Sequence, residues 1–285
     1  MKEEDMFLGN AAKKDGVISI IPVPYEGSCS HERGCADGPD AIIRASHKLE
    51  TYNPETGLNT SEIGIRTLHK IEPEPTPEEM VDEIEAVTAK ELLKKRFPVL
   101  LGGCHTITLG AVRALDKRFK DISVISFDAH ADIKDEYDNS KLNHACIMSR
   151  VNEICPSVTV GVRSFDENEA NEIKKEKNPV IFAEEIISGN KDWQEKAIKN
   201  LSKNVYITFD LDYFDISIMP ATGTPEPGGP GWNETLEFLN KLCANKNIIG
   251  FDIVELKPIK NLEAYDFLVA NLVYKIIGYA SSGLG

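Results

Sequence analysis

Ile125-Ser126-Phe127-Asp128-Ala129-His130-Ala131-Asp132 is the stretch that decides the fold. Its apolar half continues the run that starts at Ile122 and is typical of a buried strand. Three possible metal ligands then follow at alternate positions, and in extended backbone residues two apart project to the same side. A second apolar run at 205–209 leads into Asp210 and Asp212. We therefore expect two strand ends that share one metal cluster.

Apolar runs typical of buried strands alternate with segments of helical pattern along the chain. The expected strands cover residues 17–23, 97–101, 122–127, 157–163, 179–183, 205–209 and 248–256. The expected helices cover residues 37–49, 76–95, 106–119, 144–153, 166–177, 191–202, 232–244 and 262–279, with an irregular stretch at 51–75. Most strands are continuous apolar runs, which indicates a parallel sheet covered by helices on both faces. We expect a three-layer α/β/α fold with about eight parallel strands, as a single domain over residues 1–285.

Polar residues stand at the carboxyl ends of four expected strands. These residues are His105, Asp128, Asp210 and Glu255. In open parallel sheets the ligand site lies beyond these strand ends. The candidate metal ligands are His105, Asp128, His130, Asp132, Asp210 and Asp212.

Four carboxylates and two imidazoles are more than one metal ion needs, so we expect two divalent ions bridged by carboxylates. Because the ligands are mostly oxygen and the pattern offers no thiolate, two Mn²⁺ ions are favoured over structural zinc. Two ions about 3.5–4 Å apart can lower the pKa of a shared water from about 16 towards neutrality. The residues by themselves therefore predict metal-assisted hydrolysis.

Each motif taken alone also has a simpler interpretation. An isolated Asp-x-Asp after a strand is more often a loop cap or a surface turn. Gly102-Gly103 alone could mark a phosphate loop, but no GxxxxGK[ST] or GxGxxG pattern accompanies it. It is the combination of several strand ends with metal-ligand residues that favours a dinuclear site.

The composition argues against several classes of partner. The 285 residues carry a formal net charge of −14, which argues against nucleic acid because that affinity comes from neutralising phosphates. No apolar run approaches about 18 residues, and the charged start of the chain does not resemble a secretory signal. We expect a cytoplasmic protein with six reduced cysteines, among which Cys29 and Cys35 flank His31 in a weak partial zinc motif.

Several blocks of the chain resemble the ordered signature blocks of the ureohydrolase family, which comprises arginases, agmatinases and relatives. These blocks are residues 102–106, 128–132, 209–212, 221–229 and 252–255, and residues 38–46 resemble the family's N-terminal segment. The form Gly223-Thr224-Pro225-Glu226-Pro227-Gly228-Gly229 is most similar to archaeal-type agmatinases, as is the segment 135–145. The resemblance covers nearly the whole chain and implies an arginase-like fold.

The resemblance also implies roles for single residues. One manganese would be held by His105, Asp128, Asp132 and Asp210, and the other by Asp128, His130, Asp210 and Asp212. The catalytic residues would be Asp132, which contacts hydroxide and transfers a proton, His144, which shuttles protons, and Glu255, which binds the guanidinium group. A carboxylate can accept two parallel N–H bonds from a planar guanidinium, which suits that last role. Thr224 matches a threonine close to Glu255 and completes the substrate-binding set.

The implied reaction is attack of hydroxide on a guanidinium carbon with release of urea. We expect agmatine, a small cationic guanidine, as the substrate and putrescine as the other product. Arginine or aminopropylated agmatine would follow the same chemistry. The family forms trimers or hexamers, so the resemblance also implies a homo-oligomer.

Three positions depart from the family pattern. Cys104 stands where the family usually has Asp or Glu beside the ligand His105, Ile216 stands in place of Pro, and Ala145 in place of a frequent Gly. Changes beside a ligand typically alter metal affinity or activity by about 10–100-fold. The alternative to an enzyme is therefore a non-catalytic family member that binds a metal or a partner, and Cys104 is its support.

Overall fold

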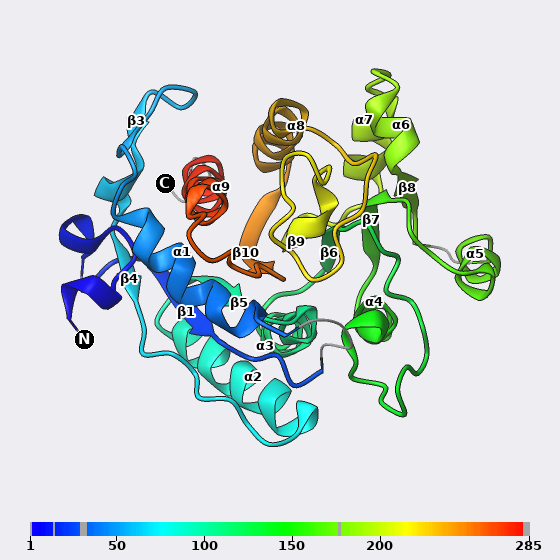
Figure 1. Ribbon diagram of the computed structural model, residues 1–285, viewed down its shortest axis with the longest axis horizontal. Helices are drawn as coiled ribbons and strands as arrows, with labels where there is room; N and C mark the ends of the chain where they lie inside the picture. The colour runs from blue at the N-terminus through cyan, green and yellow to red at the C-terminus, as the bar shows by residue number, and fades with distance from the viewer. Residues whose placement is uncertain (1, 14, 29–32, 176–177, 282–285) are drawn as a thin grey trace.

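A sheet of eight strands forms the centre of the computed structural model, which describes residues 2–13, 15–28, 33–175 and 178–281 (Figure 1). All neighbouring strands in this sheet are parallel. Their spatial order is β4 (Ile65–Thr67), β1 (Ile18–Val23), β5 (Phe97–Gly102), β10 (Asn247–Val254), β9 (Asn204–Asp210), β6 (Ile122–Phe127), β7 (Ser157–Val162) and β8 (Val180–Phe182). The expected parallel sheet of about eight strands is confirmed.

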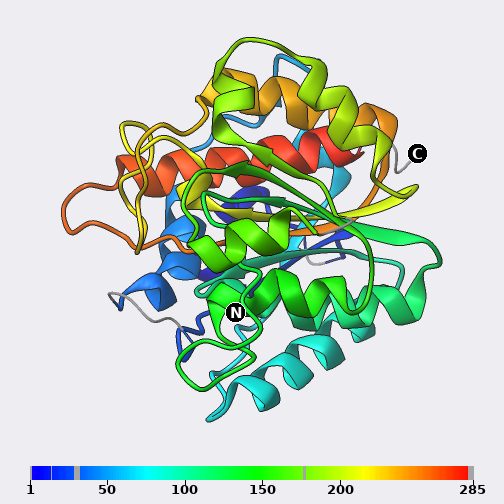
Figure 2. The same ribbon diagram turned by 90° about the vertical axis from the view of Figure 1, so that its right-hand side faces the viewer.

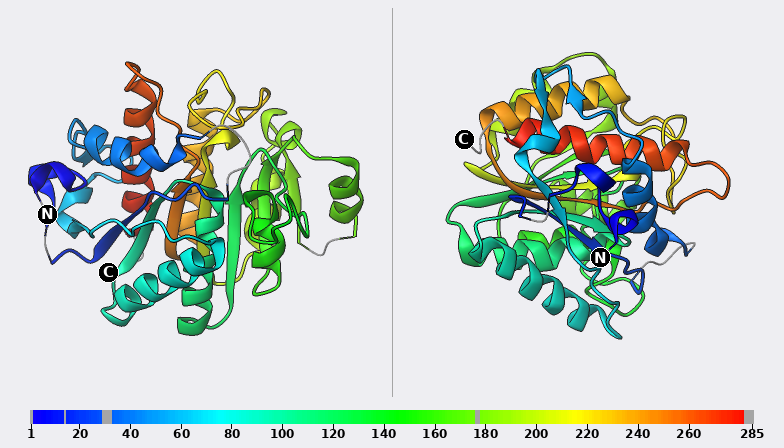
Figure 3. Two further views of the ribbon diagram at one scale, coloured as in Figure 1. Left: turned by 60° about the horizontal axis from the view of Figure 1, so that its bottom comes forward. Right: turned by 90° about the vertical axis from the view of Figure 1, so that its left-hand side faces the viewer.

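Helices cover both faces of the sheet, which completes the three layers (Figures 2 and 3). One face is covered by α1 (Gly38–Ser46), α6 (Ala183–Ile187), α7 (Asp192–Lys199), α8 (Trp232–Asn245) and α9 (Ala264–Ser281). The other face is covered by α2 (Pro77–Leu93), α3 (Thr108–Arg118) and α4 (Ile147–Asn152), while α5 (Glu167–Ile173) lies outside the β8 edge. Among the residues described, no helix has the length and apolar character needed to span a bilayer.

Side chains of each central strand alternate between the two layers of the core. In β6, Ile125 and Phe127 pack with α8 and its neighbours, whereas Ile122 and Val124 pack with α2 and α3. This alternation follows from the two-residue period of extended backbone. Both faces therefore need apolar residues, and the strands read as continuous apolar runs.

The short stretches between these elements contain single turns of 3₁₀ helix. They cover η1 (Glu3–Asp5), η2 (Gly9–Ala11), η3 (Cys35–Asp37), η4 (Thr60–Ile63), η5 (His105–Ile107), η6 (His144–Cys146) and η7 (Leu211–Tyr213). Three of them contain expected site residues: η5 begins at His105, η6 begins at His144, and η7 contains Asp212.

Two expectations about local structure are wrong. Residues 51–75 are not irregular throughout: β2 (Tyr52–Asn53) pairs with β3 (Leu58–Asn59), and β4 joins the main sheet beside β1. The segment after β8 forms α6, where only a strand end was expected. Each of these elements has five residues or fewer, so none carries enough turns or alternations to show a period. Of these elements, β4 also depends on a partner far away in the sequence, because Ile65 pairs with Ile18 of β1.

The four strands that carry the expected site residues are contiguous in the sheet, in the order β5, β10, β9 and β6. At their carboxyl ends, the last paired residues of these four strands lie opposite one another. Leu101 pairs with Ile253, Ile253 pairs with Phe209, and Phe209 pairs with Phe127. The residues just beyond these positions therefore emerge side by side at one edge of the sheet.

Candidate metal centre

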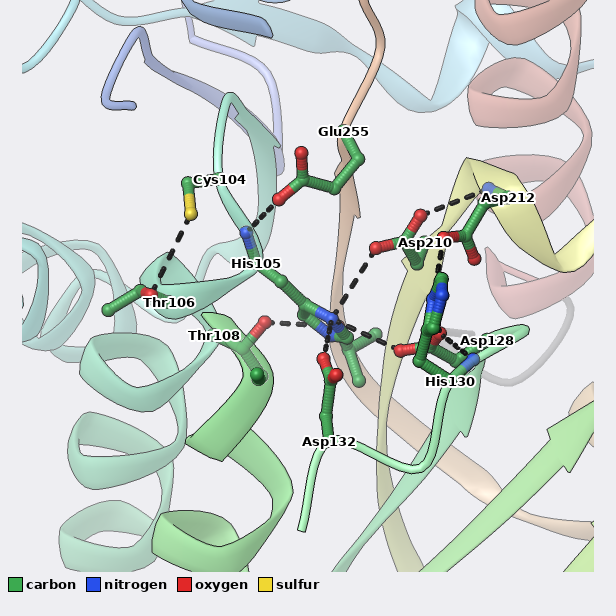
Figure 4. A network of polar contacts seen from close by, with 12 residues as sticks. Cys104, His105, Thr106, Thr108, Asp128, His130, Asp132, Asp210, Asp212 and Glu255 are labelled. Carbon is green, nitrogen blue, oxygen red and sulfur yellow. Dashed lines mark hydrogen bonds and ion pairs between the residues drawn. The ribbon is translucent and has the colours of Figure 1, made fainter. Parts of the chain in front are cut away.

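The six expected metal ligands lie together at this edge (Figure 4). Asp128 follows β6 directly, Asp210 ends β9, and His105 opens η5 after β5. Each side chain thus leaves a strand end that the core on both faces holds in place. The expected convergence of these residues is what the structure shows.

The ligand atoms form two groups around one shared carboxylate. In the first group, Nδ1 of His105 lies 3.3 Å from Oδ2 of Asp128, 3.2 Å from Oδ2 of Asp132 and 3.6 Å from Oδ2 of Asp210. In the second group, Nδ1 of His130 lies 2.9 Å from Oδ2 of Asp212 and 3.6 Å from Oδ1 of Asp128. One oxygen of Asp128 thus faces each group, which is the arrangement of a bridging ligand.

Two polar atoms at the centre of this cluster are buried without a hydrogen-bond partner among the described residues. They are Nδ1 of His105 and Oδ2 of Asp128. Buried polar atoms are almost always paired, so such atoms call for an ion or another ligand. Carboxylate oxygens and imidazole nitrogens suit divalent ions of intermediate hardness. The residues present therefore fit a pair of metal ions.

Burial and crowding of carboxylates control protonation in the metal-free cluster. Burial, followed by the charges of Asp212 and Asp128, raises the pKa of Asp210 well above its ordinary value. Burial and the charge of Asp128 raise the pKa of Asp132 to about 7. Burial works against protonation of His130, but the carboxylates of Asp128 and Asp212 outweigh it and raise its pKa to about 12. Protons thus take the place of cations in this site, and metal ions must displace them.

A buried chain of hydroxyl groups orients the ring of His105. Its Nε2 lies 2.9 Å from the hydroxyl of Thr208, which donates to Oδ1 of Asp252 at 2.7 Å. Tyr206 and Thr108 donate to Oδ2 of Asp252 at 2.7 and 2.9 Å. These side chains are fully buried. Since one ring nitrogen is held in this way, the other points into the metal cluster.

Asp132 and Glu255 both have left-handed backbone, with φ of 53° and 66°. Such a conformation costs a non-glycine residue about 1–3 kcal/mol, and it persists only where surrounding contacts impose it. The carbonyl of Asp132 accepts a hydrogen bond from the N–H of Met148 at 3.0 Å, and the N–H of Glu255 donates to the carbonyl of Gly103 at 2.7 Å. Strain of this kind is concentrated at functional sites, which supports the assignment of this edge.

Glu255 places a buried carboxylate beside the metal cluster. Its Oε1 accepts a hydrogen bond from the backbone N–H of His105 at 2.8 Å. Burial, followed by the nearby thiols of Cys104 and Cys35 and the charge of Asp210, raises its pKa well above the ordinary value. A cation beside this buried carboxyl group would stabilise its charged form, so the position suits a cationic ligand.

A cavity of about 400 Å³ opens beside the cluster. Its lining includes the expected ligands His130 and Asp132 together with His144 and Thr224. The hydroxyl of Thr224 donates to Oδ2 of Asp212 at 3.1 Å, so this side chain also touches an expected metal ligand. The structure therefore brings His144 and Thr224 to the cavity, whereas Glu255, which Thr224 was expected to approach, is not among the residues that line it.

The same cavity has an outer part that the sequence did not reveal. Lys134, Tyr137, Phe165, Asp166 and Glu169 line it. They come from the loop after Asp132 and from the start of α5, which are not related by any spacing in the sequence. A charged loop before a helix is usually solvated, so no local signal distinguishes these residues.

Arg163 is a second residue whose role the sequence did not reveal. Its guanidinium group donates to six backbone carbonyls, at 2.7 to 3.1 Å, which belong to Gly161, Asp212, Tyr213, Phe214, Glu226 and Pro227. It thereby ties the loop that carries the expected ligand Asp212 to the loop that follows Thr224. An Arg at the end of an expected strand was the available signal, because this strand also ends at the ligand edge.

Cys104 lies away from the chelating atom of its neighbour. Its thiol is fully buried and lies 3.3 Å from the hydroxyl of Ser28 and 3.8 Å from that of Thr106. The ring of His105 is oriented by Thr208 instead.

In the weak partial zinc motif, Cys29 and His31 lie outside the described residues, and Cys35 has its thiol 3.8 Å from a carboxylate oxygen of Glu26.

The fold and the site define a parallel α/β protein with a centre for a pair of divalent ions. A model described as the Arginase family matches residues 17–278. The chain is 36% identical to the N(1)-aminopropylagmatine ureohydrolase of Synechocystis sp., covering 93% of this chain and 89% of that protein. It is 31% identical to the agmatinase of Pyrococcus horikoshii, covering 97% and 96%. The agmatine ureohydrolase structure of Thermoplasma volcanium superposes with a TM-score of 0.88 at 28% identity, covering 96% and 94%. The chain belongs to the arginase family and is a hydrolase of that family.

Proposed function

We propose that this protein is a ureohydrolase that converts agmatine to putrescine and urea. Membership of the arginase family supports hydrolysis of a guanidino group. The observation that carries the proposal is the pair of ligand groups that share Asp128, with the buried carboxylate of Glu255 one hydrogen bond from His105. A cationic guanidinium held by Glu255 lies next to the atoms that would bind the two metals.

The ligand roles follow the two groups. His105 and Asp132 would hold one ion and His130 and Asp212 would hold the other, while Asp128 and Asp210 would contribute to both. We propose manganese for both ions, because oxygen ligands dominate the site. When bound, two such ions supply hydroxide at neutral pH by lowering the pKa of water.

The remaining residues bind the substrate and move protons. Glu255 accepts N–H bonds from the guanidinium group and holds its plane against the cluster, a charge-assisted contact that also fixes orientation. Asp132, whose pKa burial raises in the metal-free site, receives the proton of the nucleophile. His144, on the cavity wall, returns a proton to the leaving amine. Thr224 holds Asp212 in position through its hydroxyl.

The outer cavity favours an amine tail over an amino-acid tail. Arginine would bring an α-carboxylate, which needs a free cation. Lys134 is the cation on this wall, and its ammonium is already paired with Asp166 and Glu169. One lysine and two carboxylates leave the wall negative, which suits the ammonium group of agmatine. Aminopropylagmatine is the second candidate substrate, because several relatives at 32–36% identity carry that name.

A panel of guanidines tests the proposal. The purified protein is loaded with manganese, its metal content is measured, and urea release is followed with agmatine, aminopropylagmatine and arginine. We expect two bound ions per chain and turnover of agmatine. Urea from arginine alone would contradict the assignment to agmatine, and no urea from any guanidine would favour a non-catalytic family member.

Assembly and location complete the proposal. We propose a homo-oligomer of three or six chains that works in the cytoplasm, without nucleic-acid or membrane partners, and a single domain over residues 1–285. The acidic net charge of −14 supports the absence of a nucleic-acid partner. Light scattering of the purified protein measures the number of chains, and a monomer would contradict the proposed assembly.

A further inference from the structure

The side chain of Lys134 places an ammonium group in the outer part of the cavity. The ammonium group of Lys134 contacts Oδ2 of Asp166 and lies 2.9 Å from Oε2 of Glu169. The ring of Tyr137 is 5.9 Å from the same nitrogen. Two carboxylates and an aromatic ring around an ammonium group form the kind of site that binds an alkylammonium ligand. We call these four residues the ammonium box.

The carboxylates of the ammonium box are held in place without help from Lys134. Oδ1 of Asp166 accepts hydrogen bonds from the N–H groups of Asn168 and Glu169 at 2.8 and 3.0 Å. Oε2 of Glu169 accepts one from the N–H of Asp166 at 3.1 Å. This reciprocal cap fixes both side chains at the start of α5. Removing the lysine ammonium therefore leaves a preformed cation site.

The backbone of Lys134 is also fixed independently of its side chain. Its N–H donates to the carbonyl of Ala145 at 3.1 Å, next to His144. The side chain reaches from this point into the cavity that the metal ligands His130 and Asp132 share. A change of the lysine head group can therefore alter the cavity without moving the metal cluster.

We propose that Lys134 is a specificity-determining residue that limits the substrate tail to one positive charge. Its ammonium group occupies the place that a second ammonium group of a longer polyamine tail would take. The box with Lys134 has one net negative charge, which matches the single amine of agmatine. Without Lys134 it has two negative charges, which match a tail with two amines. The inference rests on the proposed function and adds the residue that selects between its two candidate substrates.

A purely structural role for Lys134 makes a different prediction. If Lys134 only linked the loop after Asp132 to α5, its replacement would lower the turnover of both substrates alike, because both substrates share the guanidinium end. A specificity role changes the ratio between the substrates. The ratio of kcat/KM values and the ratio of binding constants for amines therefore separate the two roles.

The experiment compares wild type with Lys134→Met, Lys134→Gln and Lys134→Arg. Lys175→Met is the matched control, because Lys175 follows α5 and forms an exposed ion pair with Glu172. Turnover is measured with agmatine and with aminopropylagmatine, and binding of putrescine and of spermidine is measured by calorimetry. Thermal melting and metal content verify that each variant is folded and loaded.

We expect Lys134→Met and Lys134→Gln to raise the preference for the longer substrate about tenfold, which corresponds to about 1.4 kcal/mol for one charge-assisted hydrogen bond. Spermidine binding relative to putrescine should rise by the same factor. Lys134→Arg and Lys175→Met should keep the wild-type ratios. Unchanged ratios in both neutral variants would overturn the inference. A wild type that releases no urea would refute the proposed function instead, and the amine-binding ratios would still decide the role of Lys134.

Discussion

Replacing Thr208 by Val tests whether the buried hydroxyl chain positions the ligand His105. Val has nearly the shape of Thr and a high β-propensity, so β9 should keep its packing. The change removes a hydroxyl that contacts Nε2 of His105 at 2.9 Å, Oδ1 of Asp252 at 2.7 Å and the hydroxyl of Thr108 at 3.0 Å. All four residues are fully buried, so water cannot replace the lost partner.

The magnitude follows from the groups that lose their partner. A buried polar group left unpaired costs about 1–3 kcal/mol. Loss of the hydroxyl unpairs Nε2 of His105 and Oδ1 of Asp252, so the free energy of unfolding should fall by about 2–6 kcal/mol. That is a large part of a typical total of about 5–15 kcal/mol. The control, Thr208→Ser, keeps the hydroxyl and loses one methyl group, which costs about 1 kcal/mol. Since His105 also loses its orientation, manganese affinity in Thr208→Val should fall by about 10–100-fold.

The assay has two parts. Urea denaturation of the metal-free proteins gives the free energy of unfolding of wild type, Thr208→Val and Thr208→Ser. Manganese titration of the same proteins at one pH gives the metal affinities. If Thr208→Val unfolds as readily as Thr208→Ser and binds manganese equally well, the hydroxyl does not position His105 and the reasoning is refuted.

Further predictions concern protonation, substrate binding and the polar contacts of Arg163 and Glu91. Because the pKa of His130 is raised to about 12, its contribution to stability is fully present below its unfolded pKa of about 6.5 and is lost as pH rises through about 12. Thermal melting of the metal-free protein should show this loss, while manganese titration should show tighter binding as pH rises. Glu255→Gln should lower kcat/KM for agmatine by about 30-fold or more while metal content, measured in parallel, stays at wild-type level. Arg163→Gln should reduce metal content measured after dialysis, whereas equal content would show that its carbonyl contacts do not position Asp212. Glu91→Gln should lower the free energy of unfolding in urea by about 1–3 kcal/mol, because buried Glu91 bonds to Ser19, Arg66, Lys94 and Arg96.

The fold could be predicted because its main signal is local. Each long strand is a continuous apolar run, and each long helix has a repeating apolar face or a clear start. In α2, for example, the hydroxyl of Thr76 accepts a hydrogen bond from the N–H of Glu79, with Pro77 in the first turn. The elements that escaped prediction, β4 and α6, are too short for a period and depend on neighbours distant in sequence.

The inner part of the site could also be predicted, for a different reason. Asp128, His130 and Asp132 follow an apolar run at alternate positions, and that spacing predicted a metal site. The structure reaches it differently from the expected extended segment, because β6 ends at Phe127 and Asp132 has left-handed backbone. Their partners at 105 and 210 were expected from the rule that ligands lie beyond the carboxyl ends of parallel strands. The position of Cys104 could not be judged in this way, because the sequence does not tell which side of η5 it faces.

The sequence by itself determined the strands, the two-residue spacing of the ligands and the choice of oxygen and imidazole donors. These properties are intrinsic to short segments of chain. Only the tertiary structure decided that β5, β10, β9 and β6 lie side by side with level ends, that Thr208 and Asp252 stand behind His105, and that Lys134 meets the carboxylates of α5. The physical reason is that strand order and loop contacts result from packing between segments about 30 to 150 positions apart, such as His105 and Glu255, which are 150 positions apart.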